Sequence, residues 1–321
     1  MKQFIFTAGL AGAVLSVSTC IAQDYRARAI RVIVTSSAGS GIDIVTRMVA
    51  QRLSEAWGKP VVVDNRLGAA GIVGAEIAAR AAPDGYTLLM ASPMFLVGVS
   101  LYAKLPYDFV RDFTPVIQVG TTPYAMAVHP TVTARSIKEF IAYAKARPGK
   151  INYGSSGVGS IAHLAGEMIK SRAQIDMTHI TYKGAPEVVT AAVSGQIDMF
   201  FNSVTVVMPQ VQSGKLRALG VASRARSVLM PDVPTIAESG MPDLEVASWY
   251  GLVAPAATPQ RAIAKLSREI TAMVNSPEMK ERLLALGTEP IGNTPEQFAA
   301  SMKAEVVRYA AAIKAAGMTP Q

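Results

Sequence analysis

Apolar residues along this chain alternate between short continuous runs and longer segments with helical spacing. Residues 30–34 read Ile-Arg-Val-Ile-Val, a run that predicts a buried strand. The next apolar positions lie three or four residues apart and predict one face of a helix: Ile42, Val45, Val49 and Leu53. Gly58 and Pro60 are expected to end that helix.

This alternation of strand and helix occurs in two series. The first series predicts strands at 61–63 and 86–90, followed by residues 92–115, which contain three prolines and are predicted to be irregular. The second series follows residues 124–128 and predicts strands at 176–182, 197–201 and 215–221. A last strand at 249–253 precedes three helices. Together these elements predict an α/β fold with mainly parallel sheets.

The order of the elements predicts two domains. If the three C-terminal helices pack on the first series, the chain crosses between the domains twice, near 116–126 and near 246–252. We therefore expect residues 23–124 and 248–321 to form domain 1, and residues 125–247 to form domain 2. Such a double-crossing hinge leaves a cleft between two lobes, a common place for small-molecule sites.

Residues 1–22 have the features of a signal peptide. Lys2 precedes an apolar stretch at 4–17, and Cys20-Ile21-Ala22 offers small residues for cleavage before Gln23. The alternative is a lipoprotein anchored through Cys20, although the residues before it lack the usual lipidation pattern. Cleavage after Ala22 would remove the only cysteine, which suits export to an oxidising compartment. We expect a periplasmic protein.

The charge pattern narrows the classes of partner. The formal net charge is +8, but the basic residues are scattered and form no block of five or six. A nucleic-acid binder would more often cluster them with aromatic residues, so we expect no nucleic-acid partner. Beyond the signal peptide no run of about 18 apolar residues occurs. We expect a monomer that attracts anionic solutes mildly.

Two small-residue turns between a strand and a helix are the main functional signal. In the 155–160 turn, glycines follow a short strand that ends near Tyr153, and Ser160 is a natural N-cap for the next helix. Unpaired N–H groups and the helix dipole make such a start attractive to anions. The alternative is a capped turn that binds nothing.

The 37–41 turn repeats the arrangement, with Ser40 and Asp43 in the S-x-x-D spacing of a capping box. Facing each other across a cleft, the two turns could hold two carboxylates of one ligand without a buried cation. Asp43 is expected mainly to cap its own helix. If a carboxylate ligand lies nearby, Asp43 would orient water molecules or accept a hydrogen bond from an amine or hydroxyl of the ligand. His163 is expected to be structural, with ligand contact as the alternative.

Catalytic patterns are weak. The 154–158 stretch ends in Val158 and misses the G-x-S-x-G elbow, and the three histidines show no metal-ligand spacing. We therefore predict no enzyme activity, no metal and no cofactor. A secreted serine-dependent hydrolase that uses Ser155 or Ser156, the latter with His163, remains the alternative.

Several motifs along the mature chain resemble one family, the tripartite tricarboxylate transporter substrate-binding proteins, or Bug family. They are Asp43 with Arg47, the stretches 63–71, 83–88, 152–157 with His163, 182–184, 195–198, 231–235 and 238–240. The resemblance implies a two-lobed fold similar to type II periplasmic binding proteins. It also implies capture of a small carboxylate or related solute for integral membrane transporter subunits or a sensor kinase.

The resemblance and the two turns together define the expected ligand-contact residues: Ser37, Ala38, Gly39, Ser40, Asp43, Ser155, Ser156, Gly157, Gly159, Ser160, His163, Lys183 and Asp198. One departure matters. The family's first turn usually reads Ala-Pro-Gly-Gly before Thr-Asp, whereas this chain has Ser40 in the turn and Ile42 before Asp43. The identity of the ligand is therefore not carried over from the family.

Overall fold

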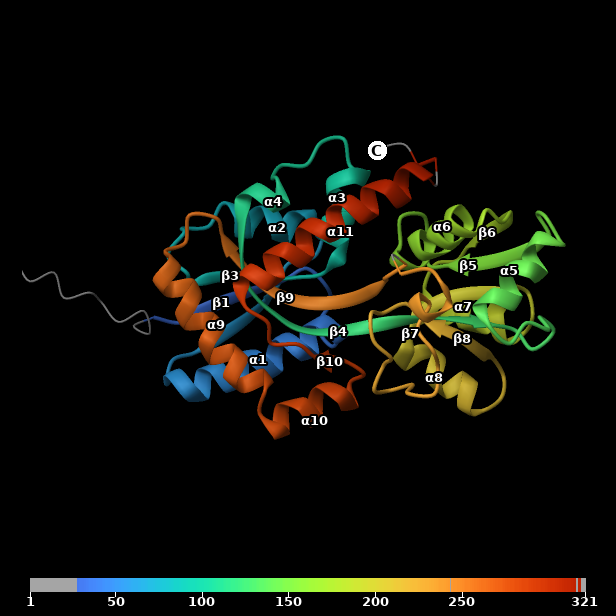
Figure 1. Ribbon diagram of the computed structural model, residues 1–321. Helices are drawn as coiled ribbons and strands as arrows, with labels where there is room; N and C mark the ends of the chain where they lie inside the picture. Colours follow the sequence, from blue (N-terminus) through green and yellow to red (C-terminus); the bar gives the residue numbers. More distant parts are fainter. Residues whose placement is uncertain (1–27, 243, 316, 319–321) are drawn as a thin grey trace, which may run out of the picture.

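The computed structural model describes residues 28–242, 244–315 and 317–318 (Figure 1). The predicted signal peptide and Cys20 lie outside the described residues. Within the described ranges, no helix is both long enough and apolar enough to cross a membrane.

The first half of the molecule is built on three parallel strands. β1 (Ile30–Val34) lies between β2 (Val61–Asn65) and β3 (Thr87–Ala91), so the carboxyl ends of all three strands share one edge. The helices of this half are α1 (Gly41–Trp57), α2 (Ile72–Ala79), α3 (Pro93–Leu101) and α4 (Phe109–Asp112), with a 3-10 turn η1 (Ala69–Gly71).

The second half repeats this plan. β5 (Ile151–Ser155) lies between β6 (Met177–Thr181) and β7 (Met199–Ser203), and all three run parallel. Its other elements are α5 (Ile137–Lys145), α6 (Ile161–Ala173), α7 (Ala185–Val193), α8 (Val204–Gln212), β8 (Arg217–Val221) and the 3-10 turn η2 (Ala237–Ser239). The predicted repetition of strand and helix is confirmed.

Two long strands connect the halves. β4 (Phe113–Val128) pairs antiparallel with β9 (Ala247–Pro255) over residues 113–123, and with β7 and β8 over residues 124–128. Figure 1 shows β4 and β9 running side by side from one half to the other. The chain thus crosses twice where the sequence predicted, and these crossings add antiparallel pairs to the expected parallel sheets. Independent domains with boundaries after 124 and 247 stay a prediction.

The C-terminal helices return to the first half, as expected. α9 (Gln260–Val274) packs against α1 and β4, and α10 (Pro277–Ala285) leads to the short strand β10 (Glu289–Pro290), which pairs with β4. α11 (Pro295–Ala315) contacts α3 and then α6, so this helix spans both halves (Figure 1).

The prediction of an irregular segment at 92–115 was wrong, because α3 and α4 lie within it. Pro93 occupies the first turn of α3, where a missing N–H costs nothing. The run after it is almost wholly apolar and shows no amphipathic period, since α3 is packed against both the first-half core and α11. An apolar run between prolines does not distinguish such a buried helix from loop.

Candidate functional site

The 37–41 turn lies at the carboxyl end of β1 and is held by the buried carboxylate of Asp43. Asp43 Oδ2 accepts from Gly39 N at 2.8 Å and from Arg47 Nε at 2.9 Å, while Oδ1 accepts from Asn65 Nδ2 at 2.9 Å. The side chain is only 1% exposed. The Arg47 hydrogen bond, aided by those from Gly39 and Asn65, lowers the pKa of Asp43 to about 2.

The predicted capping box at Ser40 was wrong in detail. Ser40 is the N-cap of α1, but its hydroxyl lies 2.7 Å from Ser36 Oγ and makes no capping hydrogen bond to the helix. Asp43 reaches back to Gly39, one residue before the cap, and Gly39 adopts a φ of +82°, a conformation that favours glycine. Asp43 therefore positions the turn, and its oxygens are already committed to protein donors.

Sequence reasoning missed Asn65 as part of this turn. Its Nδ2 also donates to Ser36 O at 2.9 Å, and its Oδ1 accepts from Arg47 Nη2 at 2.9 Å. Asn65 ends β2, next to β1, so the shared carboxyl edge of parallel strands is the signal that could have identified it.

A pocket of about 320 Å³ opens beside the 37–41 turn. It lies where β1, β2 and β3 give way to their loops and helices. Its polar lining comes from Thr35, Ser36 and Ser92, and its apolar lining from Ile42, Leu67, Met94 and Phe95, with the 68–71 turn between them. Of the predicted contact residues in the first half, none of the turn residues 37–40 lines this pocket.

The 155–160 turn follows β5 and is ordered by the fully buried Ser155. Its Oγ donates to Gly157 O at 3.0 Å, accepts from Gly157 N at 3.2 Å and lies 2.7 Å from His179 Nε2. Ser160 caps α6 by accepting from His163 N at 3.2 Å, as predicted. Ser156 and Val158 are exposed, so they are the side chains this turn presents to solvent.

His163 is buried and bonded within the protein, a placement that fits the structural role expected for it. Its Nδ1 accepts from Gly159 N at 3.1 Å, which puts the ring proton on Nε2. The ring stacks on His179 with centroids 3.9 Å apart, and Tyr153 also stacks on His179 at 4.8 Å. Burial, reinforced by His179, lowers the pKa of His163 to about 4, and burial also lowers the pKa of His179.

The two remaining predicted residues, Lys183 and Asp198, lie at opposite ends of the parallel strands of the second half. Lys183 is exposed and follows β6, whose neighbour Tyr182 donates its N–H to Ser155 O at 2.9 Å, so Lys183 lies near the 155–160 turn. Asp198 precedes β7, and its carboxylate accepts from Asn152 N at 2.8 Å near the start of β5. That is the opposite edge of the sheet from the turn, where Asp198 ties two strands together.

Helix α3 connects the two turns. Its N-cap Ser92 lines the pocket beside the 37–41 turn, and its last residue, Leu101, touches the 155–160 turn. A Cβ added to Gly159 would lie 2.6 Å from Leu101 Cδ2. Nine helical residues span about 13 Å, so α3 holds the pocket and the second turn about that far apart along its axis.

Comparison with known proteins agrees with this architecture. The model of the tripartite tricarboxylate transporter family receptor matches residues 45–318. Protein BugT of Bordetella pertussis is 35% identical over 316 residues, which cover 98% of this chain and 95% of that protein. The chain belongs to this receptor family.

Solved structures of similar proteins support the same fold for this family member. Rpa4515 of R. palustris, solved with adipate, superposes with a TM-score of 0.76 at 31% identity and covers 93% of this chain and 100% of its own. MatC (Rpa3494) from Rhodopseudomonas palustris, with bound malate, gives a TM-score of 0.70 at 28% identity over 89% and 99% of the two chains. The expected two-lobed binding-protein fold is confirmed.

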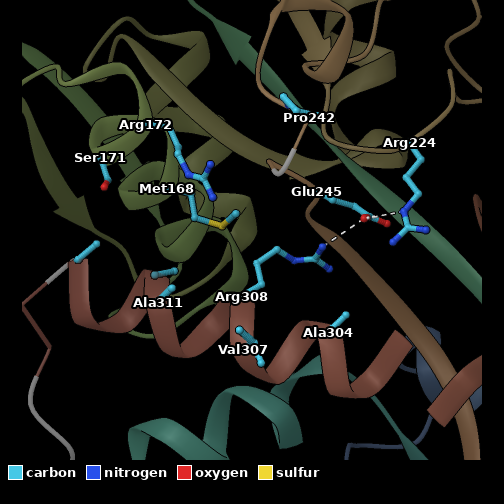
Figure 2. Close-up of a pocket in the computed structure, with 12 residues that line it drawn as sticks. Met168, Ser171, Arg172, Arg224, Pro242, Glu245, Ala304, Val307, Arg308 and Ala311 are labelled. Carbon is cyan, nitrogen blue, oxygen red and sulfur yellow. Dashed lines mark hydrogen bonds and ion pairs between the residues drawn. The ribbon is translucent and has the colours of Figure 1, made fainter. Parts of the chain in front are cut away.

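This family member has a second pocket, of about 400 Å³, between α6 and α11 (Figure 2). Arg308 on α11 and Arg224 from the second half both donate to Glu245 Oε2, at 3.1 and 3.0 Å. On α6 the lining residues begin at Met168, whereas the 155–160 turn precedes the helix. The second pocket therefore lies away from both turns, and its ion pairs link the two halves.

Proposed function

We propose that this protein is an extracytoplasmic solute-binding protein that captures a small carboxylate, or a related solute, between its two lobes. The observation that carries the proposal is the pair of glycine-bearing turns, one in each half, at the two ends of α3. Each turn precedes a long helix whose first N–H groups have no partner within the helix. Preorganised N–H donors of this kind suit an acid.

Family membership supports the solute class. Two similar proteins were solved with adipate and with malate, and both ligands are small organic acids. The double strand β4–β9 supplies a hinge about which the lobes would close on the ligand. We expect delivery of the acid to integral membrane subunits of a tripartite tricarboxylate-type transporter, or to a sensor kinase, from a periplasmic location.

The geometry speaks against the serine hydrolase alternative. Ser155 lies beside His179, but its side chain has no exposed surface, and its hydroxyl is bonded to both the N–H and the carbonyl oxygen of Gly157. Ser156 is exposed, yet within the described residues its hydroxyl makes no hydrogen bond to a histidine. The Nδ1 of His163 is already occupied by Gly159 N, so it is a poor base.

Native mass spectrometry of the protein purified from a periplasmic extract tests the proposal. We expect a stoichiometric small acid that is released on denaturation and that raises the melting temperature when it is added back. The competing result is turnover of an ester substrate that Ser156→Ala abolishes. That result would replace capture by catalysis.

A further inference from the structure

We infer that the pocket beside the 37–41 turn takes an uncharged, apolar part of the ligand, so that the preferred solute is a monocarboxylic acid with a hydrocarbon body. The inference rests on the proposed function and adds the chemical class of solute. It replaces the symmetrical arrangement predicted from the sequence, in which each turn holds one carboxylate.

The lining of the pocket is the first observation. None of the residues that line it is charged, and four of them are large and apolar: Ile42, Leu67, Met94 and Phe95. Phe95 is fixed from behind by Phe109, whose ring stacks on it with centroids 5.0 Å apart. The apolar wall is therefore preformed, which is the usual property of a site for a hydrocarbon group.

The exposure of this wall is the second observation. Leu67 is 56% exposed and Met94 is 51% exposed, although both border a hollow. Across the α3 helix, Val158 of the 155–160 turn is 60% exposed. These large side chains lie in the loop after β2, on α3 and in the 155–160 turn, and an apolar solute body would remove them from water.

The charge already present at the 37–41 turn is the third observation. Asp43 places a buried, ionised carboxylate at the N-terminal end of α1, where it accepts the Gly39 N–H and complements the helix dipole. Arg47 pairs with Asp43 and compensates this charge, but Asp43 already takes the Gly39 N–H, so a ligand carboxylate at this turn would find that donor occupied. The first turn of α6 contains no acidic residue, so no side-chain carboxylate there competes with the ligand's carboxylate for the N–H groups that begin the helix.

Ile42 adds to the difference between the two turns, because it lies in the first turn of α1 and lines the apolar pocket. At this position the chain presents a branched hydrocarbon with no hydroxyl that could meet a polar ligand group. Ile42 therefore makes the pocket less polar, as Leu67, Met94 and Phe95 also do.

A matched pair of acids tests the inference. Hexanoate and adipate have the same six-carbon chain and differ only in the methyl or carboxylate at the far end. Isothermal titration of the full mature protein should show hexanoate binding at least tenfold more tightly than adipate, because the pocket must desolvate the second carboxylate. We expect 3-phenylpropanoate to follow hexanoate and malate to follow adipate.

Two variants connect the preference to the pocket. Leu67→Ser should weaken hexanoate severalfold while adipate changes little, and Ile42→Thr should narrow the ratio between the two acids. Leu286→Ser is the matched control, since Leu286 is 40% exposed at the end of α10 and lines no part of this pocket. It should leave the affinity for both acids unchanged.

The outcomes are distinguishable. Adipate or malate binding as tightly as hexanoate, or tighter, would overturn the inference and leave the proposed capture of acids standing. Binding of none of the four acids would overturn the proposed function and the inference with it. A hexanoate preference that Leu67→Ser and Leu286→Ser reduce equally would also overturn it, since the pocket would then not be its source.

Discussion

The indole Nε1 of Trp249 donates a 2.8 Å hydrogen bond to the buried carboxylate of Glu305. Trp249 lies on the crossing strand β9 and Glu305 on α11, so this bond ties the connection between the halves to the helix that spans both. Glu305 is 8% exposed, and burial raises its pKa to about 7, although Trp249 and Arg308 oppose the shift. This group makes the stability of the fold depend on pH.

The first prediction concerns Glu305→Gln. A carboxyl group whose pKa is higher in the folded state contributes stability that is fully present below about pH 4.5 and is lost as pH rises through about 7. The loss amounts to about 3 kcal/mol. Glutamine keeps the acceptor for Trp249 and carries no charge, so the variant should be more stable than wild type at pH 8 and similar at pH 4.5.

Urea unfolding at several pH values measures this difference. Glu281→Gln, an exposed change on α10, is the control and should follow the wild-type pH profile. A Glu305→Gln profile parallel to that of wild type would contradict the assignment, since the buried carboxyl would then not titrate in this range.

The second prediction concerns His163→Asn. A histidine whose pKa falls to about 4 on folding contributes stability that is present above about pH 6.5 and is lost as pH falls toward 4. Asparagine offers an oxygen near the position of Nδ1 for the Gly159 N–H, but it cannot be protonated. The variant should therefore lose less stability than wild type between pH 6.5 and 4, although His179 keeps part of the dependence.

The two groups act in opposite directions over the same pH range, so the wild-type protein should show a shallow profile. Chemical unfolding of the double variant separates them. If the single changes shift the profile in the same direction, at least one of the two pKa directions is wrong.

Strand and helix positions were largely predictable, because β1, β6 and α1 follow directly from their apolar periodicity and from end signals such as Gly58. The two glycine-bearing turns were found for the same reason. The side chains that hold those turns were not predicted. Asn65 and His179 come from neighbouring strands, and only the sheet brings Asn65 to Asp43 and His179 to Ser155. Sequence spacing carries no record of such contacts.

The misplacement of Asp198 has the same cause. Motif matching put it among the ligand contacts, but a residue before a strand and a residue after one lie at opposite edges of a parallel sheet. The polarity of the pocket also depends on Leu67, in the loop after β2, and on Met94, in α3, and only the fold brings these two residues to one pocket.

The third prediction compares two glycines with the same backbone conformation. Gly39 has φ +82° and open space around an added Cβ, whereas Gly159 has φ +78° and Leu101 at 2.6 Å. Alanine at either position bears about 1–2 kcal/mol of backbone strain. Gly159→Ala should be destabilised further by the contact with α3, and Leu101→Ala should relieve that excess. Equal unfolding free energies for the two glycine variants would show that the turn and α3 are not tightly packed.

The last prediction asks whether main chain or a cation holds the acid. Gly157 has φ +129°, with open space around an added Cβ, so Gly157→Val strains the 155–160 turn and places a branched side chain where the ligand's carboxylate must approach. It should reduce affinity far more than Lys183→Ala, because Lys183 is exposed and its attraction is screened by solvent. Ser156→Ala should cost about 1.5–3 kcal/mol if its exposed hydroxyl meets the carboxylate. Titration of these variants with the acid that binds wild type measures each effect, and melting temperatures separate lost binding from lost folding. If Lys183→Ala abolishes binding while a folded Gly157→Val retains it, a basic side chain holds the acid and the helix start does not.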